Sequence, residues 1–128
     1  MGARLMATTT SKRIAVIGSR DFDDYERLKA VVIPHLPARL ISGGAKGADA
    51  LAERLATEQE LPIDVIPADW GRYGRSAGPI RNKQIVESAD LVIAFWDGKS
   101  RGTRSALAHA EKAGVPVEVH HPDGTVTE

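Results

Sequence analysis

Residues 40–52 carry the clearest chemical pattern in the chain, because an apolar run leads through three glycines into a helical pattern that starts near Ala48. Glycine lets a backbone approach a ligand with no Cβ in the way. The following helix presents unpaired N–H groups and the positive end of its dipole to the turn, an arrangement suited to phosphate. Alternatively, glycine serves only the packing of a tight connection. The candidate ligand-binding residues of this turn are Ser42, Gly43, Gly44, Ala45, Gly47 and Asp49, and Asp49 would face ribose hydroxyls or support the helix start.

Two further turns have a similar composition. One follows the apolar run at residues 13–17, and the other spans residues 97–103, where Lys99 and Arg101 add positive charge before a helical pattern. Both predict donors for an anion. The alternative interpretation gives Ser19 a structural hydrogen bond and Thr103 a helix-capping role. The candidate ligand-binding residues of these two turns are Gly18, Ser19, Arg20, Asp97, Gly98, Gly102 and Thr103.

A basic helix start completes the candidate site. Arg81, Asn82 and Lys83 follow Pro79 at the beginning of a helical pattern. Arginine binds phosphate through a planar, bidentate fork, and lysine binds it as a point charge. Positive side chains at a helix N-terminus oppose the helix dipole, which favours their retention for a ligand over a merely solvated first turn.

Three aromatic side chains near these turns leave two interpretations open. Trp70, Tyr73 and Trp96 could stack on a base. Packing of the same rings in the core or in a lid is an equal alternative.

Several kinds of site are excluded or left unassigned. The chain has no cysteine, which excludes disulfides, cysteine-zinc sites and a thiol nucleophile. None of the four histidines has metal-ligand spacing with an acid, so no metal site is predicted. The GxxxxGK[ST] pattern is absent, which argues against a Walker ATPase. No catalytic residue can be assigned, and no cofactor is expected to be required.

The hydrophobic pattern alternates between short apolar runs and helical periodicity. Strands are predicted at residues 13–17, 38–41, 61–67, 90–96 and 115–119, and helices from about 24, 48, 80 and 103. This order predicts an α/β fold: one Rossmann-like, doubly wound parallel sheet of about five strands with helices on both faces. Ligands of such sheets bind beyond the carboxyl ends of the strands, where all the candidate turns fall. Residues 69–79 are predicted to be a loop, and Pro116 predicts an edge position for the last strand.

Composition sets the outer limits. The chain has 128 residues, and we expect a flexible tail at 1–11, one ligand-binding domain at 12–120 and a C-terminal surface tail at 121–128. Lys plus Arg equals Asp plus Glu at 17 each, so an extended nucleic-acid-binding surface is not expected. No apolar run approaches the roughly 18 residues of a membrane span, and the N-terminus has no signal-peptide pattern. A cytoplasmic location is the expectation.

Four segments in this order resemble the SLOG superfamily: IGSRDF, SGGAKGADALA, PIRNKQI and the DG…GT turn. This Rossmann-like group includes the LOG phosphoribohydrolases and the DNA-processing protein DprA, and the similarity is greatest to its small stand-alone YspA-like branch. The resemblance covers about residues 13–119. It implies binding of a nucleotide or nucleotide-derived ligand, such as an NAD- or ADP-ribose-like molecule, by a sensor or carrier that could form a homo-oligomer.

The resemblance also implies roles for individual residues. The turn at 42–49 matches the first glycine-rich element, residues 81–83 match the Arg-Asn-Arg/Lys element of DprA, and Gly102-Thr103 matches the LOG phosphate loop. The acidic residues that follow that loop in LOG enzymes are absent here, because Arg104-Ser105-Ala106 occupy their place. Cleavage of an N-glycosidic bond needs a carboxylate near the anomeric carbon, by analogy with glycoside hydrolysis. We therefore expect binding rather than cleavage.

Two alternatives remain open at this point. The first is a nucleotide N-glycosidic hydrolase whose carboxylate comes from elsewhere. The candidates for that carboxylate are Asp21, Asp49, Asp69 and Asp97. The second is single-stranded DNA binding of the DprA type, which the neutral net charge disfavours.

Overall fold

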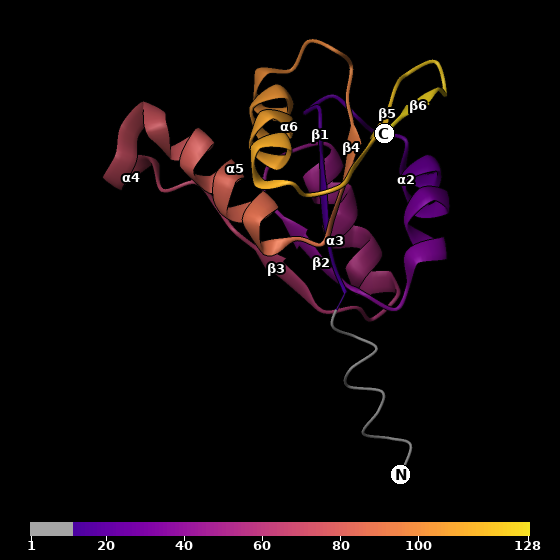
Figure 1. Ribbon diagram of the computed structural model, residues 1–128. Coiled ribbons are helices and arrows are strands. Elements are labelled where there is room, and N and C mark those ends of the chain that lie inside the picture. Colours follow the sequence, from indigo (N-terminus) through magenta and orange to yellow (C-terminus); the bar gives the residue numbers. More distant parts are fainter. Residues whose placement is uncertain (1–11) are drawn as a thin grey trace.

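The computed structural model describes residues 12–128, so the tail expected at 1–11 lies outside the described residues. A six-stranded sheet in the order β3-β2-β1-β4-β5-β6 forms the centre of the fold (Figure 1). The first five strands run parallel, and β6 is antiparallel to β5. The predicted α/β class with a parallel sheet is therefore confirmed. The strands are β1 (Arg13–Gly18), β2 (Arg39–Ser42), β3 (Ile63–Val65), β4 (Leu91–Phe95), β5 (Val117–His120) and β6 (Val126–Thr127).

Helices cover both faces of the sheet, with α5 and α6 on one side and α2 and α3 on the other (Figure 1). The α-helices are α2 (Tyr25–Val32), α3 (Ala48–Glu58), α4 (Trp70–Tyr73), α5 (Ala77–Ser88) and α6 (Arg101–Ala113), and the 3₁₀ turns are η1 (Ile33–His35) and η2 (Gly74–Ser76). Successive strand residues point to opposite faces, so β1 sends Ile14 and Val16 toward α2 and α3 and Ala15 toward α5 and α6. Burial on both faces explains why the strands read as continuous apolar runs.

The carboxyl ends of β1 and β4 meet at the point where the strand order reverses. These central strands pair in register from Ile14 opposite Leu91 to Gly18 opposite Phe95. From β1 the chain crosses toward β2 and β3, and from β4 it crosses the other way toward β5. The turns that leave β1 and β4 therefore diverge to opposite sides, which opens space beyond the sheet edge.

Residues 69–79 are helical where a loop was predicted. Asp69 caps α4, because its Oδ1 accepts the N–H of Arg72 at 3.1 Å. Gly74 ends that short helix with a positive φ of 55°, and η2 leads directly into α5. The three glycines of this segment suggested irregular structure, whereas one of them ends a helix and another, Gly78, lies inside one.

The C-terminal residues 121–128 form a hairpin with β5, so the prediction of a simple tail there was wrong, although these residues do lie at the surface. The N–H and hydroxyl of Thr125 both donate to Oδ1 of Asp123, and Gly124 adopts a positive φ of 93°. This Asp-Gly turn returns the chain to pair β6 with β5. The predicted edge position of the last strand was also wrong, since β6 pairs with β5 and Pro116 precedes the strand.

Among the helices of residues 12–128, none is both long and apolar enough to cross a bilayer.

Candidate functional site

A cleft of about 500 Å³ lies at the carboxyl edge of the sheet. The exit turn of β1, the turn before α3, the first half of α5 and the start of α6 form its walls. It thus brings together residues that lie far apart in the sequence. Ten of the sixteen candidate binding residues line it: Gly18, Ser19, Arg20, Ala45, Asp49, Arg81, Asn82, Asp97, Gly102 and Thr103.

The start of α6 offers the cleft its free backbone donors. The N–H groups of Arg101, Gly102 and Thr103 have no hydrogen-bond partner among residues 12–128. Ser100 precedes the helix but makes no capping side-chain hydrogen bond to its backbone, and the Thr103 hydroxyl turns instead to the Ser100 hydroxyl at 3.3 Å. A Cβ on Gly102 would meet no protein atom within 4 Å, so this glycine faces open space. Free first-turn amides and a helix dipole favour an anion at this position.

The loop before α6 is fixed by Asp97. Its carboxylate accepts the N–H groups of Lys99 and Ser100, each at 2.8 Å. These two hydrogen bonds hold the pKa of Asp97 below its ordinary value. The N–H of Asp97 in turn donates to the hydroxyl of Ser19 at 3.2 Å, which joins the exit turn of β1 to the loop after β4. Ser19 therefore has the structural hydrogen bond that was its alternative role, and it also lines the cleft.

Arg81 and Asn82 connect three elements across the cleft. Nη1 of Arg81 donates to the carbonyl of Gly43 at 2.7 Å, and its Nε donates to Oδ1 of Asn82 at 2.9 Å. Nδ2 of Asn82 donates to the carbonyl of Gly102 at 3.2 Å. Arg81 thus braces the glycine turn of β2, and Asn82 braces the first turn of α6. Because α5 begins at Ala77, residues 81–83 lie in its second turn and not at the helix start that was predicted. Lys83 is exposed and does not line the cleft.

Asp49 is the buried carboxylate of the cleft, with 8% of its surface exposed. Its Oδ2 accepts the N–H of Ala45 at 3.1 Å. Burial raises the pKa of Asp49 above its ordinary value, while the Ala45 hydrogen bond and the positive charge of Arg81 act in the opposite direction. A Cβ on Gly43 would lie 2.7 Å from Arg81 Nη1 and 2.9 Å from Asp49 Oδ2, so Gly43 permits this close arrangement.

The remaining candidates of the first glycine turn do not line the cleft. The Ser42 side chain is buried, donates to Glu53 at 3.2 Å and accepts the N–H of Gly44 at 3.2 Å. A Cβ on Gly47 would overlap the backbone carbonyl of Ser19, so this glycine lets α3 pack under the exit turn of β1. Outside the cleft lining lie Ser42, Gly43, Gly44, Gly47, Lys83 and Gly98.

The aromatic candidates separate into two groups. Trp96 is half-buried, and its Nε1 donates to the carbonyl of Ser100 at 3.1 Å, so it holds the loop before α6. Trp70 and Tyr73 lie on α4, 55% and 39% exposed, and neither lines the cleft.

Ile85 and Ala106 form an apolar part of the cleft lining that was not predicted from the sequence. Helix periodicity could have found both. Ile85 is four residues after Arg81, and Ala106 is three residues after Thr103, so each shares a helix face with a candidate polar residue.

Comparisons with known proteins concern the sequence and the fold of the chain. The model of the family described as YspA, cpYpsA-related SLOG matches residues 12–73, which contain the exit turn of β1 and the first glycine turn. Gene 61 protein of Mycobacterium phage D29 is 36% identical in an alignment of 117 positions that covers 83% of this chain and 94% of that protein.

Two solved structures share the fold. DNA processing protein A (DprA) from Streptococcus pneumoniae superimposes with a TM-score of 0.71 at 20% identity, over 84% of this chain and 50% of that one. DNA processing protein A from Helicobacter pylori, described with a single-stranded DNA binding mode, superimposes with a TM-score of 0.63 at 21% identity, over 86% of this chain and 65% of that one. This chain thus spans half to about two thirds of their length, and the likeness shows a common architecture. The chain is 36% identical to the phage protein, and the family model matches the chain through its first glycine turn. The chain therefore belongs to the YspA, cpYpsA-related SLOG family.

Proposed function

We propose that this chain binds a nucleotide or nucleotide-derived ligand, such as an NAD- or ADP-ribose-like molecule, as a sensor or carrier. The observation that carries this proposal is the set of free first-turn amides of α6, which open into the cleft at the point where the strand order reverses. Lys99 and Arg101 line the same wall, so an anionic group bound there would meet positive charge as well as N–H donors.

The cleft favours holding a ligand over cleaving it. Arg104 and Ser105 follow Gly102-Thr103 where a carboxylate would be needed for LOG-type hydrolysis. The carboxylate of Asp97 already accepts two backbone hydrogen bonds and has a lowered pKa, which is unsuited to a general acid.

One observation supports hydrolysis of an N-glycosidic bond as a second candidate. Asp49 is a buried carboxylate in the cleft with a raised pKa, and a general acid in glycoside cleavage requires such a shift. Release of free base from a nucleotide, abolished by Asp49→Asn, would establish that activity. No release under conditions where the nucleotide binds would restrict the chain to binding.

Thermal unfolding with a panel of ligands tests the proposal. The panel comprises AMP, ADP, NAD, ADP-ribose and a short single-stranded oligonucleotide, the last because DprA-type DNA binding is the third candidate. A ligand present at about 100 times its dissociation constant adds about 2.7 kcal/mol to the free energy of unfolding, which raises the melting temperature measurably. If no nucleotide raises it, the proposal fails.

A charge variant tests whether the anionic group binds at the start of α6. Gly102→Asp places a carboxylate in the open space beside the free amides, so we expect it to abolish the nucleotide-induced shift. A negative charge at a helix N-terminus is favourable to the fold, so the variant should remain folded. Ala108→Asp makes the same charge change on an exposed position of α6 outside the cleft, and it should leave the shift intact.

A further inference from the structure

A second hollow of about 280 Å³ adjoins the cleft. The two spaces share Ser19, Asp21 and Asp97 in their linings, and within this shared lining the Asp97 N–H donates to the Ser19 hydroxyl. The start of α6 contributes to the cleft only, whereas the start of α2 and the end of β5 contribute to the hollow. A molecule longer than one phosphate group could therefore extend from one space into the other.

Aromatic rings form the wall of this second hollow. The rings of Phe22 and Phe95 stack with centroids 4.7 Å apart, and His120 stacks on the other side of Phe95 at 5.2 Å. The planes are inclined by only 24° and 25°, and all three residues line the hollow together with Trp96. Because Phe95 is only 1% exposed between the other two rings, a planar ring that enters the hollow can stack only on the outer side of this column or on Trp96.

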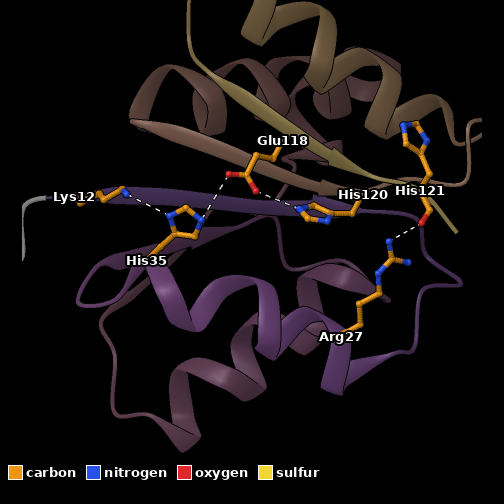
Figure 2. A network of polar contacts seen from close by, with 6 residues as sticks. All are labelled: Lys12, Arg27, His35, Glu118, His120 and His121. Carbon is orange, nitrogen blue, oxygen red and sulfur yellow. Dashed lines mark hydrogen bonds and ion pairs between the residues drawn. The ribbon is translucent and has the colours of Figure 1, made fainter. Parts of the chain in front are cut away.

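A polar network holds His120 from behind (Figure 2). Nε2 of His120 contacts Oε1 of Glu118 at 3.2 Å, and Oε2 of Glu118 contacts Nε2 of His35 at 3.6 Å. Lys12 reaches Nδ1 of His35 at 3.4 Å. His120 is 7% exposed, so its ring is fixed both by stacking and by the carboxylate. The wall is thus positioned before any ligand enters, which lowers the entropic cost of binding.

The same figure shows how α2 is attached to this wall. Nη2 of Arg27, which also lines the hollow, donates to the carbonyl of His121 at 2.6 Å. This contact joins α2 to the chain just beyond β5. Within residues 12–128, no group of three or more His, Asp or Glu side chains has the arrangement of a metal site.

The rim of the hollow carries free carboxylate acceptors beside the guanidinium of Arg27, which is engaged with the His121 carbonyl. Asp21 and Asp23 are exposed carboxylates in its lining, and neither has a hydrogen-bond or ion-pair partner among the residues described. Asp24 also lines it, but its carboxylate caps α2 by accepting the N–H of Arg27. The hollow therefore combines aromatic faces with free acceptors, whereas the start of α6 combines free N–H donors with positive charge.

We propose that the second hollow is the subsite for a flat nitrogen heterocycle bearing N–H donors, the base end of a ligand whose anionic end lies at the start of α6. This inference rests on the proposed nucleotide function and adds the direction in which the ligand lies. The ring stacks against the aromatic wall at Phe22 and Trp96. Its N–H donors face Asp21 and Asp23.

Dissociation constants for AMP and ribose 5-phosphate test the subsite, since the two probes differ by the ring. The wild-type chain should bind AMP at least about tenfold more tightly, as loss of one base stack costs about that factor. Phe22→Leu keeps an apolar side chain but removes the ring, so it should bring the dissociation constant of AMP close to that of ribose 5-phosphate. Tyr73→Leu removes a ring from α4, outside both spaces, and should leave the tenfold ratio unchanged. Asp23→Asn, at an exposed position, should weaken AMP binding several-fold and leave ribose 5-phosphate unaffected.

The two tryptophans provide an independent readout. Trp70→Phe leaves Trp96, in the lining of the hollow, as the single tryptophan of the chain, which excitation at about 295 nm selects over the two tyrosines. AMP should then change the fluorescence and protect it from acrylamide quenching, whereas ribose 5-phosphate should give no such protection. Trp96→Phe leaves only the exposed Trp70 and should respond to neither probe.

The outcomes separate this inference from the proposed function. If AMP binds but the ratio to ribose 5-phosphate survives Phe22→Leu and Trp96 stays accessible to quencher, the ring lies elsewhere and the subsite is refuted while nucleotide binding stands. If neither probe binds the wild-type chain, the subsite and the phosphate site at α6 fail together.

Discussion

At the scale of single residues, two charged side chains of the cleft, Arg81 and Asp97, already have partners within the protein. Arg81 donates to the Gly43 carbonyl and to Asn82, and Asp97 accepts two backbone N–H groups. These residues shape the cleft first and can contact a ligand only with their remaining donor or acceptor capacity. The free backbone amides of α6 need no such rearrangement.

Arg81 therefore serves stability as well as binding. We predict that Arg81→Lys lowers the free energy of unfolding by about 1 kcal/mol, because lysine lacks the fork that reaches both the Gly43 carbonyl and Asn82. Chemical denaturation measures this loss. Lys83→Arg, at an exposed neighbouring position, is the control and should leave stability within experimental error. Equal stability of the two variants would show that the Arg81 contacts contribute nothing.

Asp49 predicts an unusual pH dependence. Its pKa is raised in the folded state above the ordinary 3.8, so the folded chain holds that proton more tightly than the unfolded chain. The stability that the protonated carboxyl contributes is fully present below about 3.8 and is lost as the pH rises through the raised pKa. Asp49→Asn removes this loss.

The melting temperature of Asp49→Asn should consequently exceed that of the wild type most at neutral pH, and the difference should shrink toward pH 3. Parallel melting curves of both chains from pH 3 to pH 7 measure it. A difference that grows toward acid pH would mean that the ionised carboxylate stabilises the fold.

At the scale of elements, α2 and α3 are joined by a tyrosine whose ionisation is suppressed. The Tyr25 hydroxyl donates to Glu58 at 2.6 Å, and the guanidinium of Arg54 lies 3.8 Å from the centroid of the Tyr25 ring. Burial, together with the hydrogen bond to Glu58, raises the pKa of Tyr25 to about 12. The neutral phenol is thus the form that the folded state favours.

Stability should therefore fall as the pH rises from 10 to about 12, where the unfolded tyrosine ionises and the folded one does not. Lysines titrate in the same range, so the measured quantity is the difference between the wild type and Tyr25→Phe in urea unfolding. That difference should decrease between pH 10 and pH 12. A constant difference would show that the Tyr25 hydroxyl titrates normally.

Substitution by alanine should lower the free energy of unfolding strongly at one candidate glycine and only slightly at another. At Gly47 a Cβ would overlap the Ser19 carbonyl, and φ is +78°, so Gly47→Ala should cost at least about 3 kcal/mol or prevent folding. At Gly102 the Cβ enters open space, so Gly102→Ala should change the free energy of unfolding by less than about 1 kcal/mol. Circular dichroism during urea titration distinguishes them, and a mild effect at Gly47 would contradict the packing of α3 under β1.

Sequence predicts best the elements whose residues are buried by contacts with distant parts of the chain. The apolar runs of β1 and β4 are buried on both faces, which leaves a continuous hydrophobic signal, and Asp24 and Gly114 cap α2 and α6. The segments at 69–79 and 121–128 were mispredicted because a single local device decides each one. Asp69 initiates α4, and the Asp123-Gly124 turn directs β6 back onto β5.

The sequence predicted which turns form the candidate site, but not which side chains of each turn face the cleft. Parallel topology places the exit turns of β1, β2 and β4 at one edge, which is why ten candidates share a cleft. Which residues of a glycine turn face the ligand depends on the neighbouring turn. Ser42 points toward Glu53 and Gly47 faces Ser19, and neither contact has a signal in the local sequence.

At the scale of the whole molecule, the distribution of charge decides between a small ligand and a polyanion. Equal numbers of acidic and basic residues give no net attraction for nucleic acid. Positive charge is instead concentrated in the cleft, at Arg20, Arg81, Lys99 and Arg101, beside three carboxylates. Such a cleft can neutralise the one or two phosphates of a nucleotide, whereas binding along a single strand requires a basic track.

The salt dependence of the affinity distinguishes a small nucleotide ligand from a single strand of DNA. For single strands the logarithm of affinity falls with the logarithm of salt concentration by about 0.7 for each neutralised phosphate. A mononucleotide held at the start of α6 should give a slope near −1, and a single-stranded oligonucleotide should bind no more tightly and with no steeper slope. The measurement is fluorescence anisotropy of labelled AMP and of a labelled oligonucleotide over a range of salt concentrations. A slope of about −4 for the oligonucleotide, with tighter binding than AMP, would require roughly six neutralised phosphates. The cleft cannot supply that number, so such a result would move the function of this chain from a nucleotide to a DNA strand.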